Sequence, residues 1–168
     1  MEIKARARSP ERQARLAEAL ASGPAERIVQ EDTFFVVPAG RLKLRVFGSG
    51  GGELIQYERP DSKAPSESSY VCAPTQHPEA LRAALARALG VRAVVRKTRT
   101  VHLAGRTRIH LDRVEGLGEF IELEVVLGPD EATARGVAVA RELMARLEIE
   151  ESDLIEAAYV DLLEACGR

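Results

Sequence analysis

Charged and apolar residues alternate with a period of two in several segments of the chain, and this alternation constrains the fold more than any other feature. Because successive side chains of a β-strand point to opposite faces, each segment predicts a strand with one charged face and one apolar face. These segments are residues 2–8, 41–46, 106–112 and 119–127. Turn residues and strand-forming residues predict further strands near 28–37, 53–58, 68–73 and 94–103.

Glycine-rich turns and four amphipathic helices complete the pattern. Gly48–Gly52 and Gly116–Gly118 predict hairpins, so we expect neighbouring strands to pair antiparallel. The predicted helices follow Ser9 and end before Gly23, run from Pro78 to Gly90, run from about Asp130 through Leu147, and follow Ser152 with Ile155, Ala158, Tyr159 and Leu162 on one side. Each helix carries an apolar stripe that needs an apolar surface to cover. Without a linker or a repeat, the pattern predicts a single α+β domain over residues 1–168.

The charged strand faces carry both signs, and two interpretations stay open for them. An antiparallel sheet normally exposes one face to water, which would make these faces ordinary surface. Alternatively, the sheet curls closed, the helices cover its apolar outer side, and the charged faces line a lumen. Clusters of Arg and Lys beside separate carboxylates would suit a polyphosphate that is bound together with a divalent metal ion.

Composition argues against several other classes of protein. A net charge of −2 does not fit a general binder of nucleic acid or of membrane surfaces, and aromatic residues do not interleave the basic ones as in a single-strand groove. No apolar run approaches the ~18 residues that span a bilayer, and we see no secretory signal, so we expect a cytoplasmic protein. Cys72 and Cys166 form neither a disulfide framework nor a metal knuckle.

Several short motifs recur in an order that resembles a known family. They are Glu2-Ile3-Lys4, Asp32-Thr33-Phe34-Phe35, Leu42-Lys43-Leu44-Arg45, Tyr57 followed by Pro60-Asp61, Lys97-Thr98-Arg99, and the hairpin from Arg108 to Glu124. The hairpin is the most specific of them. Over nearly its whole length, the chain resembles the CYTH superfamily, the triphosphate tunnel metalloenzymes, which includes class IV adenylyl cyclases and thiamine triphosphatases.

This resemblance implies an eight-stranded antiparallel β-barrel that forms a tunnel, with helices packed outside. In the family, basic side chains grip the triphosphate and acidic ones hold Mg²⁺ or Mn²⁺. Carried over position by position, the catalytic residues implied are Lys4, Arg45, Lys97, Arg99 and Asp112. The metal ligands implied are Glu2 and Glu122, and Lys43 stands where the family often has an arginine. Beyond these matches, we expect Lys43 and Arg108 to help bind the triphosphate and Glu124 to add a metal ligand.

Two positions depart from the family pattern, and one histidine has two readings. The first glutamate of the family's N-terminal pair would precede Met1, which leaves Glu2 alone unless Glu124 or Glu58 replaces the missing ligand. Glu58 follows Tyr57 where many members have a lysine, so we expect a reversed charge inside the tunnel. His110 shares a face with charged residues and would either touch the substrate or serve as a hydrogen-bonded wall residue.

The resemblance implies one reaction and leaves others open. The Arg108–Glu124 hairpin and the segment from Tyr57 to Asp61 look most like the cyclase subgroup, which converts ATP to cyclic AMP and pyrophosphate. The alternatives are a triphosphatase for thiamine triphosphate or inorganic tripolyphosphate, and a non-catalytic binder of nucleotides or polyphosphate. The expected partner is therefore a triphosphate small molecule, with a homodimer formed through the barrel wall or the terminal helix as a further expectation.

Overall fold

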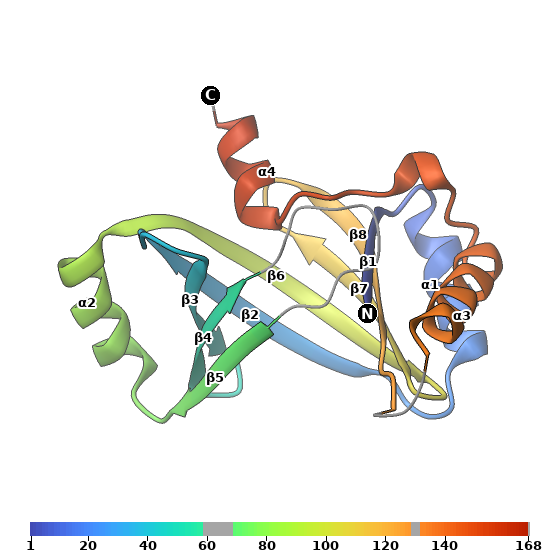
Figure 1. Cartoon of the computed structure of the whole chain (residues 1–168), viewed down its shortest axis with the longest axis horizontal. Coiled ribbons are helices and arrows are strands. Elements are labelled where there is room, and N and C mark those ends of the chain that lie inside the picture. Colours follow the sequence, from blue (N-terminus) through green and yellow to red (C-terminus); the bar gives the residue numbers. More distant parts are fainter. Residues whose placement is uncertain (59–68, 129–131, 168) are drawn as a thin grey trace.

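In the computed structural model, which describes residues 1–58, 69–128 and 132–167, eight strands form one antiparallel sheet (Figure 1). The strands are β1 (Glu2–Arg6), β2 (Glu26–Phe35), β3 (Arg41–Phe47), β4 (Gly52–Glu58), β5 (Ser69–Thr75), β6 (Val91–Ala104), β7 (Thr107–Val114) and β8 (Gly118–Val125). The helices are α1 (Pro10–Leu20), α2 (Pro78–Leu89), α3 (Thr133–Arg146) and α4 (Tyr159–Cys166), with a 3₁₀ turn at Glu151–Asp153.

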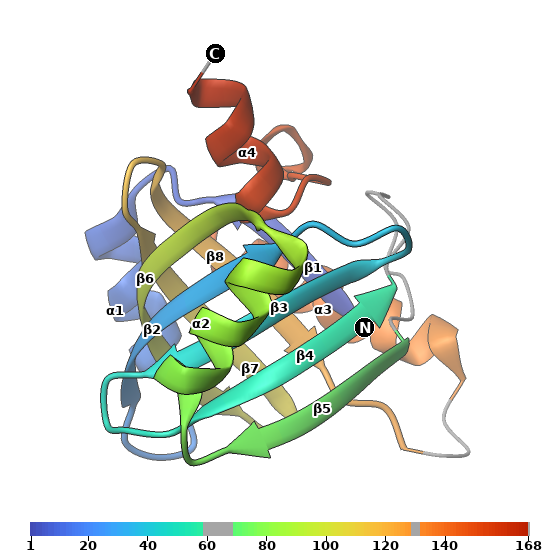
Figure 2. The same cartoon turned by 90° about the vertical axis from the view of Figure 1, so that its left-hand side faces the viewer.

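The sheet curls into a tunnel-like barrel. Its strand order is β1-β8-β7-β6-β2-β3-β4-β5, and the long strands β2 and β6 join the two halves (Figure 1). Figure 2 shows β3, β4 and β5 on the near side, with β7 and β8 behind them. Within the described ranges, the edge strands β1 and β5 do not pair with each other, so backbone hydrogen bonds do not close the barrel. The prediction of an eight-stranded antiparallel barrel with helices outside is confirmed, apart from this open seam.

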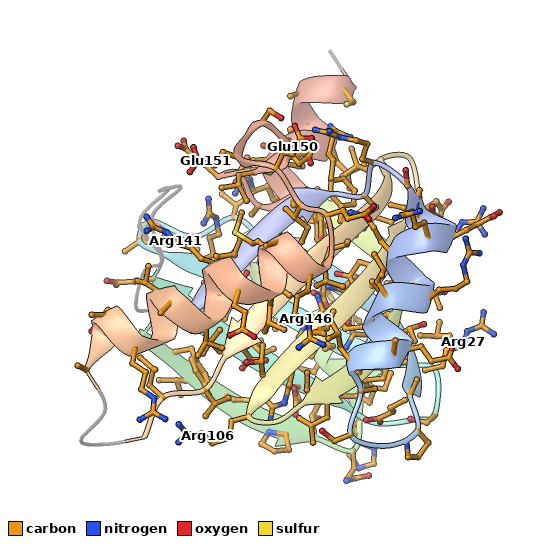
Figure 3. The ribbon with its side chains drawn as sticks, turned by 90° about the vertical axis from the view of Figure 1, so that its right-hand side faces the viewer. Arg27, Arg106, Arg141, Arg146, Glu150 and Glu151 are labelled. Atoms are coloured by element: carbon orange, nitrogen blue, oxygen red, sulfur yellow. The ribbon has the colours of Figure 1, made fainter. Side chains whose placement is uncertain are left out.

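Two helices cover the apolar outer face of β1, β7 and β8. Alternation turns the apolar residues of these strands outward, where they pack against apolar residues of α1 and α3. The buried residues of this cluster are Ile3, Ala5, Ala17, Ile109, Ile121, Leu123, Val125, Ala140, Leu143, Met144, Leu147 and Ile149. Gln13 of α1 donates a hydrogen bond of 3.0 Å to the carbonyl oxygen of Leu147 just after α3. Figure 3 shows the two helices side by side, with Arg141 and Arg146 on the exposed side of α3.

The helix predicted after Ser152 begins later than expected, at Tyr159. Residues 154–158 run beside β1 instead, because Leu154 bridges to Ala5 and the Ile155 N–H donates 2.9 Å to the Lys4 carbonyl oxygen. The helix starts where the carboxylate of Asp161 accepts a hydrogen bond from the Ala158 N–H. This backbone path carries Tyr159 to one end of the barrel interior, where it packs with Phe120.

The remaining helices match their predictions with small differences in length. Helix α1 ends at Leu20 rather than just before Gly23, and α2 spans Pro78–Leu89 as expected. The start predicted for α3 near Asp130 lies outside the described residues, as does the Pro60-Asp61 part of the motif after Tyr57. No helix in the described ranges is long and apolar enough to cross a membrane.

Candidate active site in the tunnel

The charged strand faces meet inside the barrel around a cavity of about 290 Å³. The charged residues that line it are Glu2, Lys4, Asp32, Arg41, Lys43, Arg45, Lys97, Arg99, Glu122, Glu124 and Glu156. Lys4, Lys97, Arg99 and Glu122 are each less than a tenth exposed. These faces are therefore not ordinary wetted surface, and the lumen interpretation is correct.

Asp112 on β7 anchors two of the predicted phosphate-binding residues. Its carboxylate accepts hydrogen bonds from Lys97 Nζ at 3.0 Å and from Arg99 Nε and Nη2 at 2.6 Å each. The third donor is the Tyr159 hydroxyl, at 3.1 Å. The side chain is fully buried, and both oxygens are engaged. Asp112 can therefore fix the position of two cations, while direct contact with a substrate would first require these bonds to break.

Asp32 on β2 repeats this arrangement on the other half of the barrel. Its carboxylate accepts hydrogen bonds from Lys43 Nζ and from Arg45 Nε and Nη2, each at 2.8 Å. Burial opposes the ionisation of Asp32, yet the charges of Lys43 and Arg45 outweigh it and hold the pKa of the carboxyl well below its usual range. Each aspartate thus holds a Lys-x-Arg pair of one neighbouring strand.

Burial and neighbouring cations lower the pKa of two lysines of the cavity, Lys43 and Lys97. Burial lowers the pKa of Lys43 to about 8, with Arg45 and Lys97 acting in the same direction and Asp32 opposing them. Burial also lowers the pKa of Lys97, together with the charge of Arg99 and against the attraction of Glu122. Burial is the largest cause of both shifts, so each ammonium loses its proton more easily in the cavity than it would in water.

Glu122 on β8 is the most constrained of the predicted metal ligands. It forms ion pairs with Arg99 and, at 3.5 Å, with Lys4 Nζ. Burial opposes its ionisation, but Arg99, Lys4 and Lys97 hold its pKa well below the usual range. The Nδ1 atom of His110 lies 3.8 Å from Glu122 and makes no hydrogen bond in the described structure.

Glu2 and Glu124 occupy a different place, at the open side of the cavity. They stand directly opposite each other on β1 and β8, so both carboxylates belong to the same inner face. Glu124 is 38% exposed and pairs with Arg108 at 3.0 Å. Arg108 itself is half exposed, which places this predicted triphosphate ligand at the rim rather than among the buried cations.

The described residues hold no ready-made cluster of three His, Cys, Asp or Glu side chains for a metal ion. Mg²⁺, however, is usually held by one or two carboxylates together with water and substrate phosphates. Glu2 and Glu124 fit that mode because they are hard oxygen donors at the same end of the cavity. Glu122 fits it less well, because its buried carboxylate is paired with two cations, whereas Glu124 is partly exposed and pairs with Arg108 at the rim.

Tyr159 closes one end of the cavity, a role that the sequence did not reveal. The centre of its ring lies 4.4 Å from Lys4 Nζ and 5.1 Å from Lys97 Nζ, within the range of cation–π attraction. Burial, together with the charges of Glu122 and Asp112, raises the pKa of its phenol well above the usual value. As a tyrosine on an apolar helix stripe, it carried no local signal of a tunnel position.

Glu58 and Asp32 also differ from expectation. For both, the reason is that successive side chains of a strand point to opposite faces of the sheet. Glu58 was expected to reverse a charge inside the tunnel, but Tyr57 lines the cavity, so Glu58 lies on the opposite face and is exposed. Glu58 therefore cannot replace a missing metal ligand. Asp32 was named only as part of a motif, although its position two residues before Phe34, which lines the same cavity, could have placed it inside.

Comparisons with known proteins agree with this geometry. The PH1012 protein of Pyrococcus horikoshii is 26% identical, with a TM-score of 0.85 over 96% of this chain and 98% of that one. A proposed adenylate cyclase from Vibrio parahaemolyticus is 19% identical, with a TM-score of 0.74 over 98% and 97% of the two chains. HpAC1 from Hippeastrum, a proposed adenylyl cyclase described as having a dominant triphosphatase activity, is 18% identical, with a TM-score of 0.68 over 98% and 94%.

The two matches below 25% identity show a shared fold alone. No curated protein matches the chain. The family model for the CYTH domain matches residues 1–159, which include every residue of the cavity described above. The curled antiparallel sheet, its inward-facing cations and this match over most of the chain together show that the protein belongs to the CYTH family of triphosphate tunnel enzymes.

Proposed function

We propose that the tunnel binds a nucleoside triphosphate together with Mg²⁺ or Mn²⁺ and converts ATP to cyclic AMP and pyrophosphate. One observation carries this proposal: two Lys-x-Arg pairs, each fixed by a buried aspartate, line the same cavity from opposite halves of the barrel. A polyanion between them would be gripped from both sides, which suits a phosphate chain better than a single anionic group.

The charge balance of the tunnel floor supports a polyanionic ligand. The tunnel floor consists of the cations Lys4, Lys43, Arg45, Lys97 and Arg99 and the carboxylates Asp32, Asp112 and Glu122. The five cations exceed the three carboxylates, so the floor has an excess of positive charge. A triphosphate carries more negative charge than this excess, and a divalent cation held near Glu2 and Glu124 would balance the remainder.

The chemistry would depend on positioning and on charge stabilisation. An arginine has five N–H donors, so the two nitrogens of Arg45 that hold Asp32 leave donors for phosphate oxygens. Gripping the outer phosphates would hold the pyrophosphate leaving group still while the ribose 3′-hydroxyl attacks the α-phosphorus. The divalent cation would supply charge neutralisation on the phosphate chain.

A triphosphatase is the second candidate, and the size of the cavity favours it. At about 290 Å³ the cavity lies at the lower end of the usual range for ligand pockets, about 300–1,000 Å³. Such a space suits a phosphate chain better than an entire nucleotide. Hydrolysis of the terminal phosphate needs only the chain inside the tunnel, with the same grip and an activated water as nucleophile.

The test is to incubate the protein with ATP, thiamine triphosphate or tripolyphosphate, each with Mg²⁺, Mn²⁺ or EDTA. Cyclic AMP, pyrophosphate and phosphate are measured in parallel with thermal stability. Cyclic AMP with equimolar pyrophosphate supports the cyclase, whereas phosphate alone supports the triphosphatase. A ligand at ~100 times its dissociation constant should add about 2.7 kcal/mol to the free energy of unfolding.

Two variants control this experiment. Glu122→Gln removes the carboxylate that pairs with Arg99 and Lys4, so both cations lose a partner that positions them and turnover should be abolished in a protein that still folds. Glu142→Gln removes a carboxylate from the exposed side of α3 and should leave turnover unchanged. Binding that persists in EDTA without any product would favour a non-catalytic binder, and no stabilisation by any of the three ligands would refute the proposal.

A further inference from the structure

The wall of the cavity next to the tunnel floor is aromatic. Phe34, Ile55, Tyr57 and Tyr70 line it from β2, β4 and β5. Tyr57 and Tyr70 are direct partners in the β4–β5 ladder, so their side chains stand next to each other on the inner face. The cavity therefore changes from a charged floor to an aromatic wall within one curled sheet.

Tyr70 marks the mouth of the cavity on this side. Its side chain is 67% exposed although it lines the cavity, and it lies on the edge strand β5. Tyr57, its partner, is half-buried. An exposed aromatic ring beside a half-buried one offers apolar area against which a planar group can lie, with further burial of both rings as the gain.

Lys43 lies between the aromatic wall and the other cations of the tunnel floor. Its Nζ atom bonds to Asp32 and lies 5.6 Å from the ring centre of Phe34 and 5.7 Å from that of Tyr57. Arg41, one inward position further along β3, lies 6.0 Å from the ring of Tyr57. A phosphate on Lys43 would thus leave the next part of its molecule beside the aromatic side chains of this wall.

We propose that Tyr70, with Tyr57 beside it, forms a stacking subsite for the planar heteroaromatic group of a triphosphate ester. The inference rests on the proposed function, because the subsite has a purpose only if the phosphate chain occupies the tunnel floor. The phosphate chain lies inside the cavity, and the organic group lies at its mouth against Tyr70. Stacking accepts any planar ring, so the subsite selects triphosphate esters over inorganic tripolyphosphate without reading one base.

The test compares two ligands on the same variants. Dissociation constants for ATP and for tripolyphosphate, both with the same divalent metal, are measured calorimetrically for the wild type, Tyr70→Ala, Tyr70→Phe and Val71→Ala. Tyr70→Ala should weaken ATP binding by about tenfold and change tripolyphosphate binding by less than about twofold. Tyr70→Phe keeps the ring and should keep both affinities.

Val71→Ala is the matched control, because Val71 is equally exposed on the opposite face of the same strand. It should change neither affinity, and thermal melting of each variant verifies folding. An equal loss for both ligands in Tyr70→Ala, or no loss for ATP, would overturn the subsite while the phosphate grip stands. A wild type that binds neither ligand would overturn the proposed function and the subsite together.

Discussion

The hydroxyl of Tyr159 on α4 donates a hydrogen bond of 3.1 Å to the carboxylate of Asp112 on β7, 47 residues earlier in the chain. The same carboxylate holds Lys97 and Arg99. Tyr159, which closes one end of the cavity, is therefore hydrogen-bonded to Asp112, which positions two of the cations proposed to bind phosphate. Changes at α4 should reach the tunnel floor through this contact.

Tyr159→Phe removes the hydroxyl and leaves the ring in contact with Lys4 and Lys97. We expect a loss of about 1 kcal/mol in the free energy of unfolding, because Asp112 keeps its other donors. Tyr159→Ala removes the ring as well and should cost about 3–5 kcal/mol, as for other buried aromatic residues. Urea unfolding measures both. Equal losses in the two variants would mean that the ring contributes nothing.

Asp32→Asn removes the negative charge that Lys43 and Arg45 share and leaves these two partly buried cations beside each other. Breaking a buried ion pair by removing one partner typically destabilises a protein by about 3–5 kcal/mol. A bound triphosphate would restore opposite charge to the two cations, so ligand should stabilise the variant more than the wild type. Thermal melting with and without tripolyphosphate measures this difference, and a smaller shift in the variant would contradict a positioning role for Asp32.

ATP affinity should fall as pH rises through about 8, because Lys43 loses its proton there. Only the charged ammonium attracts phosphate, while the phosphates of ATP, whose last pKa is about 6, are already ionised over this range. Lys43→Arg keeps its charge at every pH of the experiment and should give a flat profile. Dissociation constants between pH 7 and 9.5 measure the effect. An unchanged slope in Lys43→Arg would assign the titration to another group.

Acid should destabilise the protein through Glu122. Its pKa is lower in the folded state than the usual 4.5, so the unfolded chain takes up a proton first as pH falls. The contribution of Glu122 to stability is therefore present above about pH 5 and is lost as pH falls further. Urea unfolding between pH 3 and 7 should show a flatter acid limb for Glu122→Gln than for the wild type, and parallel limbs would contradict the assignment.

Glu124→Gln should raise the Mg²⁺ concentration needed for half-maximal activity by at least about tenfold. Even the loss of a residue that only supports a metal ligand typically lowers metal affinity by about tenfold or more. Glu2→Gln should act in the same way, because the two carboxylates stand opposite each other. Glu58→Gln is the control on the outer face and should have no effect. Metal titrations with ATP as substrate distinguish the three variants, and an effect of Glu58→Gln would contradict its outward placement.

The sequence predicted all eight strands, because strand alternation is a local property of the chain. Alternation also placed Lys4 and Lys43 on charged strand faces, but only the family resemblance turned these faces inward and placed Arg99 in the tunnel. The same rule applied to β4 would have placed Glu58 outside, opposite Tyr57. It could not have assigned Asp32 and Asp112 to their Lys-x-Arg pairs, since those contacts depend on which strands become neighbours.

The start of α4 at Tyr159 could not be predicted from the neighbouring residues either. The amphipathic pattern after Ser152 favours a helix, yet Leu154 pairs with Ala5 at the other end of the chain. Contacts between such distant segments override helix propensity, and nothing within residues 152–159 encodes them. The position of Tyr159 follows from this override, which is why the sequence did not reveal it.

The pairing of β1 bears on the order in which the molecule assembles. The amino group of Met1 bonds to Val125, 124 residues away, and Lys4 Nζ donates 3.3 Å to the carbonyl oxygen of Ala157, 153 residues away. A ribosome releases β1 long before either partner exists, and contacts at such separations form slowly. We therefore expect Lys4 and Glu122 to remain hydrated until β8 and the segment before α4 have emerged, which would place the dehydration of the buried ions among the last steps of folding.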